Sequence, residues 1–209
     1  AKTEVEAEQP ADSTSQSVKM STNTTESVQK EQKIDKLSYG EQVNQDIQNE
    51  KFSGRLKVPL LLQTDNRWKN TSYGTGDGET ILEKTGCAIV SLAMISSYLD
   101  NTEVLPQAVI DWAHNDYYIE NQGTNWTIFG DYAAMKGYAS EDVMTLAGVE
   151  EHLTQGHPVI ISVQPGLFTE TGHIMVLTGY SDGKFWLNDP NDSTERKCSI
   201  TQYTEEQLT

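Results

Sequence analysis

The hydrophobic pattern of the chain is strongest at residues 87–99, where Cys-Ala-Ile-Val-Ser-Leu-Ala-Met-Ile-Ser-Ser-Tyr-Leu is apolar on nearly every face of a helix. A helix without a polar face is typical of a segment buried in the core. The pattern therefore predicts a buried helix, and it places Cys87 in the first turn of that helix.

Three further segments carry apolar residues at helical spacing. They span residues 106–114, 126–136 and 146–155, and the last two are followed by Gly137 and Gly156. Glycine just past a helix is a common stop, because it adopts the left-handed conformation without strain. The first half of the domain is therefore predicted to be helical.

The second half of the chain follows a different pattern. Short runs rich in Val, Ile, Leu, Tyr and Trp predict strands at residues 158–163, 173–180, 184–188 and 197–203. The turn Asp182-Gly183 separates the second strand from the third, and Asp-Gly favours a tight hairpin because it tolerates positive φ angles. Helices followed by an antiparallel sheet predict an α+β domain, with a groove between its two halves.

Residues 1–50 differ in composition from the rest of the chain. They hold ten acidic residues, five basic residues, one aromatic residue (Tyr39) and long runs of Ser, Thr, Gln, Glu and Asn. Such a segment buries too little apolar surface to offset the entropy of ordering its backbone. A disordered acidic tail or linker is therefore predicted, with the domain at residues 51–209. Residues 34–47 show only a weak helical pattern, and the first clear apolar run of the domain begins at Val58.

The charge of the chain argues against several kinds of partner. The formal net charge is −16, and both the tail (−5) and the remainder (−11) are acidic. Nucleic acids and anionic membrane surfaces need clustered Lys and Arg, whereas Arg196-Lys197 is only a pair. No run of eighteen apolar residues exists to span a bilayer. His114, His152 and His157 have no further ligand at metal-binding spacing. We expect no nucleic acid, no membrane insertion, no metal and no cofactor.

The chain begins with Ala1 rather than Met, which suggests that a leader has been removed. A polar tail ahead of a compact domain is typical of a secreted or surface-tethered protein. We therefore expect an extracellular or cell-surface protein, and a monomer.

Cys87 is the first candidate for chemistry. The N-terminus of a helix stabilises a thiolate, and a neighbouring imidazolium lowers the pKa of the thiol further. Gly86 before it leaves room for a substrate or a strand to approach the turn. The alternative is a structural cysteine, either buried at the start of a core helix or bonded to Cys198, the only other cysteine. We expect Cys198 to pack inside a strand as a small apolar residue.

His173 opens an apolar strand, where its ring can face the groove. Sixteen residues later, Asn188-Asp189 offers an amide or a carboxylate that can orient the imidazole through its second nitrogen. Because side chains alternate along strands, a strict two-residue hairpin puts Asn188 on the face of His173, whereas one bulge puts Asp189 there. Both candidates stay open. Gln63, at the end of an apolar run, can supply an oxyanion donor beside the backbone N–H of Cys87.

Together these motifs resemble the C39-like branch of the papain-like cysteine peptidases, bacterial relatives of the bacteriocin-processing double-glycine peptidases. The resemblance covers about residues 58–203, and it rests on the joint order and spacing of the motifs rather than on any one of them. The matching motifs are Val58-Pro59, Gln63-x-Asp65-x-x-Trp68, Thr85-Gly86-Cys87 with Ser91-Leu92-Ala93-Met94, Gly123-Thr124-x-Trp126, Gly172-His173 with Gly179-Tyr180, and Asn188-Asp189-Pro190. The family often has Gly-Pro-Thr after the cysteine, where this chain has Ala88-Ile89-Val90, so the substrate class stays open.

The resemblance implies a papain-like fold in which Cys87 is the nucleophile, His173 the base, Asp189 the orienting acid and Gln63 the oxyanion donor. It predicts a bacterial cysteine peptidase or amidase that acts on a peptide or amide substrate. Two alternatives are left. The same residues can transfer the acyl group to an amine, or the domain is a non-catalytic cell-surface binding module in which Cys87 is bonded to Cys198.

Overall fold

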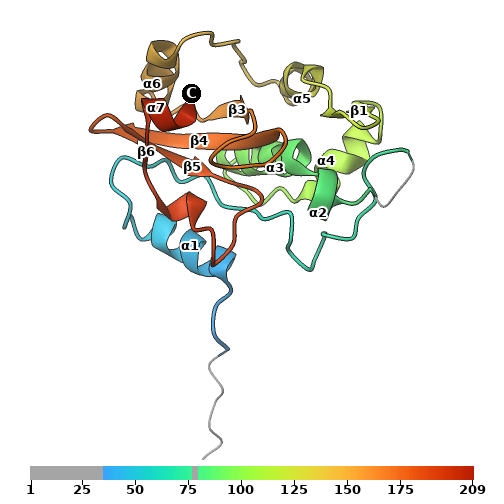
Figure 1. Cartoon of the computed structure of the whole chain (residues 1–209), viewed down its shortest axis with the longest axis horizontal. Coiled ribbons are helices and arrows are strands. Elements are labelled where there is room, and N and C mark those ends of the chain that lie inside the picture. Colours follow the sequence, from blue (N-terminus) through green and yellow to red (C-terminus); the bar gives the residue numbers. More distant parts are fainter. Residues whose placement is uncertain (1–34, 77–79) are drawn as a thin grey trace, which may run out of the picture. The chain divides into compact units, whose positions relative to one another are not determined.

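Helices α1 to α6 precede the main sheet along the chain, and a short helix, α7, follows it (Figure 1). The computed structural model describes residues 35–76 and 80–209, and Lys36–Thr209 form one compact unit. The helices are α1 Tyr39–Gln48, α2 Leu82–Thr85, α3 Cys87–Leu99, α4 Pro106–Ala113, α5 Thr127–Lys136, α6 Leu146–Thr154 and α7 Glu205–Leu208. The strands are β1 Tyr118–Ile119, β2 Gly123–Thr124, β3 Val159–Val163, β4 His173–Ser181, β5 Lys184–Asn188 and β6 Tyr203–Thr204, and a 3₁₀ helix lies at Cys198–Ile200. The chain thus combines helices with antiparallel sheets, as predicted.

Helix α3 has the bounds that the hydrophobic pattern predicts. Nine of its thirteen residues are buried, because it has no polar face to turn toward water. It follows α2 directly through Gly86, where a Cβ atom would lie 2.6 Å from the carbonyl oxygen of Leu82. Glycine at this position lets the end of α2 approach the start of α3 closely, which determines where Cys87 lies.

Helices α4, α5 and α6 also lie where the apolar spacing predicts them, within one residue at either end. Gly137 ends α5 in the left-handed conformation, with φ of 75°. Gly156, just past α6, has φ of 89°. Both glycines therefore act as the predicted stops.

The main sheet has four strands in the order β3-β4-β5-β6, and each neighbouring pair is antiparallel. Strands β4 and β5 form the predicted hairpin, in which Ser181 pairs with Lys184. Asp182 and Gly183 between them have φ angles of 54° and 75°. Two consecutive positive φ angles are typical of the hairpin turn that matches the twist of the strands.

Strand β4 lies between two apolar clusters, because successive side chains point to opposite faces of a sheet. Val176 belongs to the cluster that contains the buried residues of α3. Met175 and Leu177 belong to the cluster that contains the buried residues of α6.

A β-bulge interrupts the pairing of β4 with β5 at Thr178, where the register shifts by one residue. The segment ahead of the first apolar run of the domain covers this bulge. The N–H of Leu56 donates to the carbonyl oxygen of Thr178 over 2.7 Å, and Arg55 pairs with Gly179. A Cβ atom at position 179 would collide with the carbonyl oxygen of Gly54. Glycine at 179 is therefore what lets the two backbones meet.

The prediction of a strand at residues 197–203 is wrong for most of its length. Cys198–Ile200 form a 3₁₀ helix, and only Tyr203–Thr204 pair with β5. The cause is the buried carboxylate of Asp192, whose oxygens accept the N–H groups of the first two residues of the 3₁₀ helix over 2.9 and 2.7 Å. Those N–H groups cannot join a sheet, so the chain turns.

Helix α1 lies inside the segment predicted to be a tail. Residues 1–34 of that segment lie outside the described residues. Two apolar side chains of α1 are buried, and Asn44 exchanges hydrogen bonds of 2.9 and 2.7 Å with the backbone of Leu60. The compact unit therefore begins at Lys36, ahead of the predicted boundary at residue 51.

Candidate active site

Cys87 is the first residue of α3 and is partly exposed. The first N–H groups of a helix have no acceptor within it, so the thiol lies at the positive end of the helix dipole. Both cysteines are free thiols. Cys198 is buried, and this burial raises the pKa of its thiol. The disulfide required by the binding-module alternative is not formed in the structure.

His173 is the first residue of β4, and only 8% of its side chain is exposed. Its Nε2 atom lies 2.6 Å from Oδ1 of Asp189. Burial alone would lower the pKa of His173, but the hydrogen bond to Asp189 and the electrostatic interactions with Asp189 and Cys87 raise it to about 9.

Asp189 directly follows β5 and is fully buried. Its Oδ1 atom also accepts the N–H of Asn191 over 2.8 Å. Its Oδ2 atom receives no hydrogen bond, but Nη2 of Arg196 lies 3.2 Å away as an ion pair. The carboxylate thus lies between an imidazole and a guanidinium, where a buried negative charge is compensated on both sides.

The structure distinguishes the two neighbouring candidates for the partner of the imidazole. The register shift at Thr178 places Asp189, and not Asn188, on the face of the sheet that carries His173. Asn188 turns to the opposite face, where its Oδ1 atom accepts from Nη2 of Arg55 over 2.6 Å. Its amide nitrogen donates to two backbone carbonyls of the apolar run that opens the domain, each over 3.1 Å. Asn188 therefore fastens that run to the sheet.

Gln63 is buried beside the segment that carries Cys87, but its amide is already engaged. The Nε2 atom donates to the carbonyl oxygens of Leu82 and Glu83 over 3.1 and 3.2 Å. Its Oε1 atom is buried and has no hydrogen-bond partner. The backbone N–H of Gln63 donates to the carbonyl oxygen of Pro190, directly after Asp189, over 2.7 Å. Gln63 thus links the carboxylate loop to α2.

Two residues that the sequence pattern did not single out also belong to this site. Tyr73 is fully buried; burial raises its pKa to about 12, and the nearby Cys87 acts in the same direction. The carbonyl oxygen of Tyr73 accepts the hydroxyl of Thr85 over 2.7 Å, just ahead of α3. Arg196 contacts Asp189 as described. In the sequence, the feature that could have indicated Arg196 is its position directly after an acidic stretch, residues 189–195.

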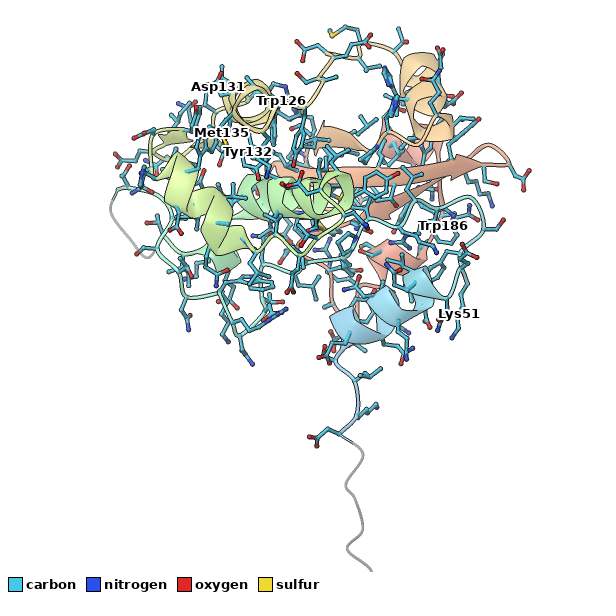
Figure 2. All side chains as sticks on the ribbon, turned by 180° about the vertical axis from the view of Figure 1, so that it is seen from behind. Lys51, Trp126, Asp131, Tyr132, Met135 and Trp186 are labelled. Atoms are coloured by element: carbon cyan, nitrogen blue, oxygen red, sulfur yellow. The ribbon has the colours of Figure 1, made fainter. Side chains whose placement is uncertain are left out.

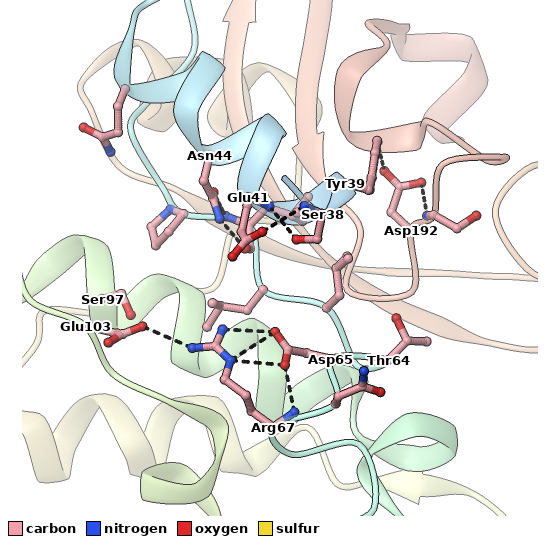
Figure 3. A pocket seen from close by; sticks show the side chains of 18 of the residues that line it. Ser38, Tyr39, Glu41, Asn44, Thr64, Asp65, Arg67, Ser97, Glu103 and Asp192 are labelled. Carbon is pink, nitrogen blue, oxygen red and sulfur yellow. Dashed lines mark hydrogen bonds and ion pairs between the residues drawn. The ribbon is translucent and has the colours of Figure 1, made fainter. Parts of the chain in front are cut away.

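Two cavities are lined by none of the candidate catalytic residues. The first, of about 1230 Å³, has α1 in its wall, and Figure 3 shows Arg67 there between Asp65 and Glu103. The second, of about 950 Å³, is lined by aromatic residues, among them Trp126 just ahead of α5 and Tyr132 within it (Figure 2). The first is therefore a charged groove and the second an aromatic one.

Within the described residues, no group of three or more His, Cys, Asp or Glu side chains is arranged to hold a metal ion. Among residues 35–76 and 80–209, no helix has both the length and the apolar composition needed to cross a membrane.

Comparison with known proteins identifies one family. The family model described as the peptidase C39-like family matches residues 55–207. No curated protein matches the chain. Among solved structures, the crystal structure of a proposed C39-like peptidase from Bacillus anthracis is similar, at 13% sequence identity and a TM-score of 0.49. That match covers 75% of this chain and 90% of the other.

Proposed function

Because the chain belongs to the peptidase C39-like family, we propose that it is a cysteine peptidase or amidase whose nucleophile is Cys87. The proposed arrangement is papain-like, with the nucleophile on a helix N-terminus and its partners on an antiparallel sheet. The observation that supports this most directly is the 2.6 Å contact between the His173 imidazole and Asp189, together with the electrostatic interaction between His173 and Cys87.

The proposed reaction begins with a proton transfer from Cys87 to His173. The thiolate attacks the carbonyl carbon of a peptide or amide bond, and His173 then gives the proton to the leaving amine. The resulting thioester is hydrolysed by water, whose proton the imidazole accepts. Asp189 holds the ring in place and stabilises its charged form.

The electrostatics of the site favour the imidazolium form of His173. The pKa of His173 is raised to about 9, so the ring is largely protonated at neutral pH. The N-terminal end of α3 favours a negative charge on Cys87. Both effects act before a substrate binds, so reactivity of the thiol is a property of the free protein.

The proposed oxyanion site combines the backbone N–H of Cys87 with the amide of Gln63. The N–H belongs to the first turn of α3, where N–H groups have no acceptor within the helix. Gln63 donates to two carbonyl oxygens of α2 in the free protein. To act as an oxyanion donor, Gln63 must therefore break one of its hydrogen bonds to α2 and donate that amide hydrogen to the oxygen of the substrate instead.

The proposal is tested by alkylation and by hydrolysis. Iodoacetamide is expected to label Cys87 much faster than Cys198, because Cys87 is partly exposed at a helix N-terminus whereas Cys198 is buried. Peptides and cell-wall fragments are screened as substrates, with Cys87→Ala as the inactive variant and Cys198→Ala as the matched active control. Amine acceptors added to the same assay separate hydrolysis from transfer, because transfer gives a new amide. Equal labelling of the two thiols, or unchanged hydrolysis by Cys87→Ala, contradicts the proposal.

A further inference from the structure

Arg196 joins the two loops that flank the candidate catalytic group. Its Nη2 atom donates a 2.5 Å hydrogen bond to the carbonyl oxygen of Phe168 and lies 3.2 Å from Oδ2 of Asp189. Its Nη1 atom donates to the carbonyl oxygen of Asn191 over 2.9 Å. Phe168 lies between β3 and β4, shortly before His173, whereas the other two residues follow β5. One guanidinium thus connects the loop leading to the candidate base with the loop carrying its carboxylate partner.

The groups that Arg196 contacts are themselves held in place. The side chain of Phe168 is 5% exposed and packs against the ring of Tyr203, with 4.9 Å between the ring centroids. Asp189 is fully buried. A planar guanidinium can reach a carbonyl and a carboxylate at the same time, whereas the ammonium of a lysine is a single point charge. The contacts therefore use the geometry of arginine as well as its charge.

We propose that Arg196 is a positioning residue that holds the Asp189 carboxylate toward His173 and limits how much of its negative charge acts on the imidazole. This inference rests on the proposed function of the Cys87 site. Arg196 is proposed to act on the imidazole through the carboxylate, and this effect on His173 is measured without a substrate.

The direction of the effect follows from the charges around the imidazole. Asp189 after β5 and Cys87 at the start of α3 face the ring, and both raise the pKa of His173. Tyr73 interacts electrostatically with Cys87. Arg196 compensates part of the charge of Asp189, so its removal exposes His173 to more of that charge and raises the pKa. The guanidinium acts on the imidazole across the carboxylate, 3.2 Å from Oδ2 while the ring is 2.6 Å from Oδ1, and it is partly solvated, so we expect a shift of about 0.5 to 1 pH unit.

The test is an NMR titration of the His173 ring in the intact protein, with its resonance assigned through a His173→Gln variant. Arg196→Met removes the charge and keeps the length of the stem, and it is expected to raise the pKa of His173 by about 0.5 to 1 unit. Arg196→Lys keeps the charge and is expected to stay close to the parent value. Lys197→Met is the matched control, because Lys197 is exposed and carries the same charge one residue away.

Amide hydrogen exchange supplies a second measurement on the same variants. Residues 164–172 are expected to exchange faster in both Arg196→Met and Arg196→Lys, because neither keeps the contacts with Phe168 and Asp189 together. An unchanged pKa of His173 in Arg196→Met, or an equal shift in Lys197→Met, would overturn the inference. Failure of Cys87 to react faster than Cys198 would instead overturn the proposed function, so the two failures are distinguishable.

Discussion

Replacement of Asp189 by asparagine removes a charge and keeps the shape of the side chain, so it isolates the effect of the carboxylate on His173. Burial by itself lowers the pKa of the imidazole. The electrostatic interactions with Asp189 and Cys87 raise it from 6.5 to about 9. Without the carboxylate the burial remains. We expect the pKa of His173 in Asp189→Asn to fall to its ordinary value or below.

The size of the effect on protonation follows from this change. At pH 8, a group with a pKa of about 9 is about 90% protonated, and one with a pKa of about 6.5 is about 3% protonated. We therefore expect the protonated fraction of His173 at pH 8 to fall by about 30-fold or more in Asp189→Asn.

The assay is an NMR titration of the His173 ring as a function of pH. Asn188→Ala is the matched control, because the Asn188 side chain forms hydrogen bonds with Arg55 and two backbone carbonyls on the other face of the sheet. It is expected to lower the free energy of unfolding by about 1–3 kcal/mol and to leave the pKa of His173 in place. An unchanged pKa of His173 in Asp189→Asn, or an equal shift in Asn188→Ala, would refute the reasoning.

Three further outcomes are expected. Gly179→Ala should lower the free energy of unfolding by about 2–4 kcal/mol, because the new Cβ atom collides with Gly54. Gly130→Ala, whose Cβ atom meets nothing within 4 Å, should instead raise the free energy of unfolding by up to about 1 kcal/mol. Equal effects of the two variants in urea denaturation would contradict this prediction. The raised pKa of His173 should stabilise the folded protein fully below pH 6.5, by up to about 3 kcal/mol, and this contribution should be lost as the pH rises through about 9. Urea denaturation across this pH range measures the loss, and a free energy of unfolding that does not change with pH would contradict the prediction. Gln63→Ala should lower kcat by about 100-fold and leave the alkylation of Cys87 nearly unchanged; a parallel loss of alkylation would show instead that Gln63 supports α2.

Local patterns were sufficient to predict several elements of the fold. The apolar periodicity and the glycine stops predicted α3 to α6 to within one residue, and Asp-Gly predicted the β4–β5 hairpin. These signals work because helix burial and turn geometry depend on neighbours in the sequence. The same kind of pattern gave a wrong prediction at residues 197–203, where the carboxylate of Asp192 accepts hydrogen bonds from backbone N–H groups that a strand would use.

The partner of the imidazole could not be predicted from spacing. Asn188 and Asp189 differ only in the face of the sheet that they occupy, and one extra residue at Thr178 reverses that choice. The bulge is covered by Leu56, whose N–H donates to the carbonyl oxygen of Thr178. That contact joins segments far apart in the chain, so no local pattern indicates it.

By itself, the sequence determined helices α3 to α6, the β4–β5 hairpin, the place of Cys87 at a helix N-terminus and the small set of residues able to partner it. Tertiary structure alone decided that Asp189 rather than Asn188 meets His173, that Gln63 bonds α2 in the free protein, and that Arg196 reaches the carboxylate. The physical reason is the range of the interactions. Periodicity and turn chemistry act over a few residues, whereas the polarity of a buried site is determined by side chains that only the complete fold brings together.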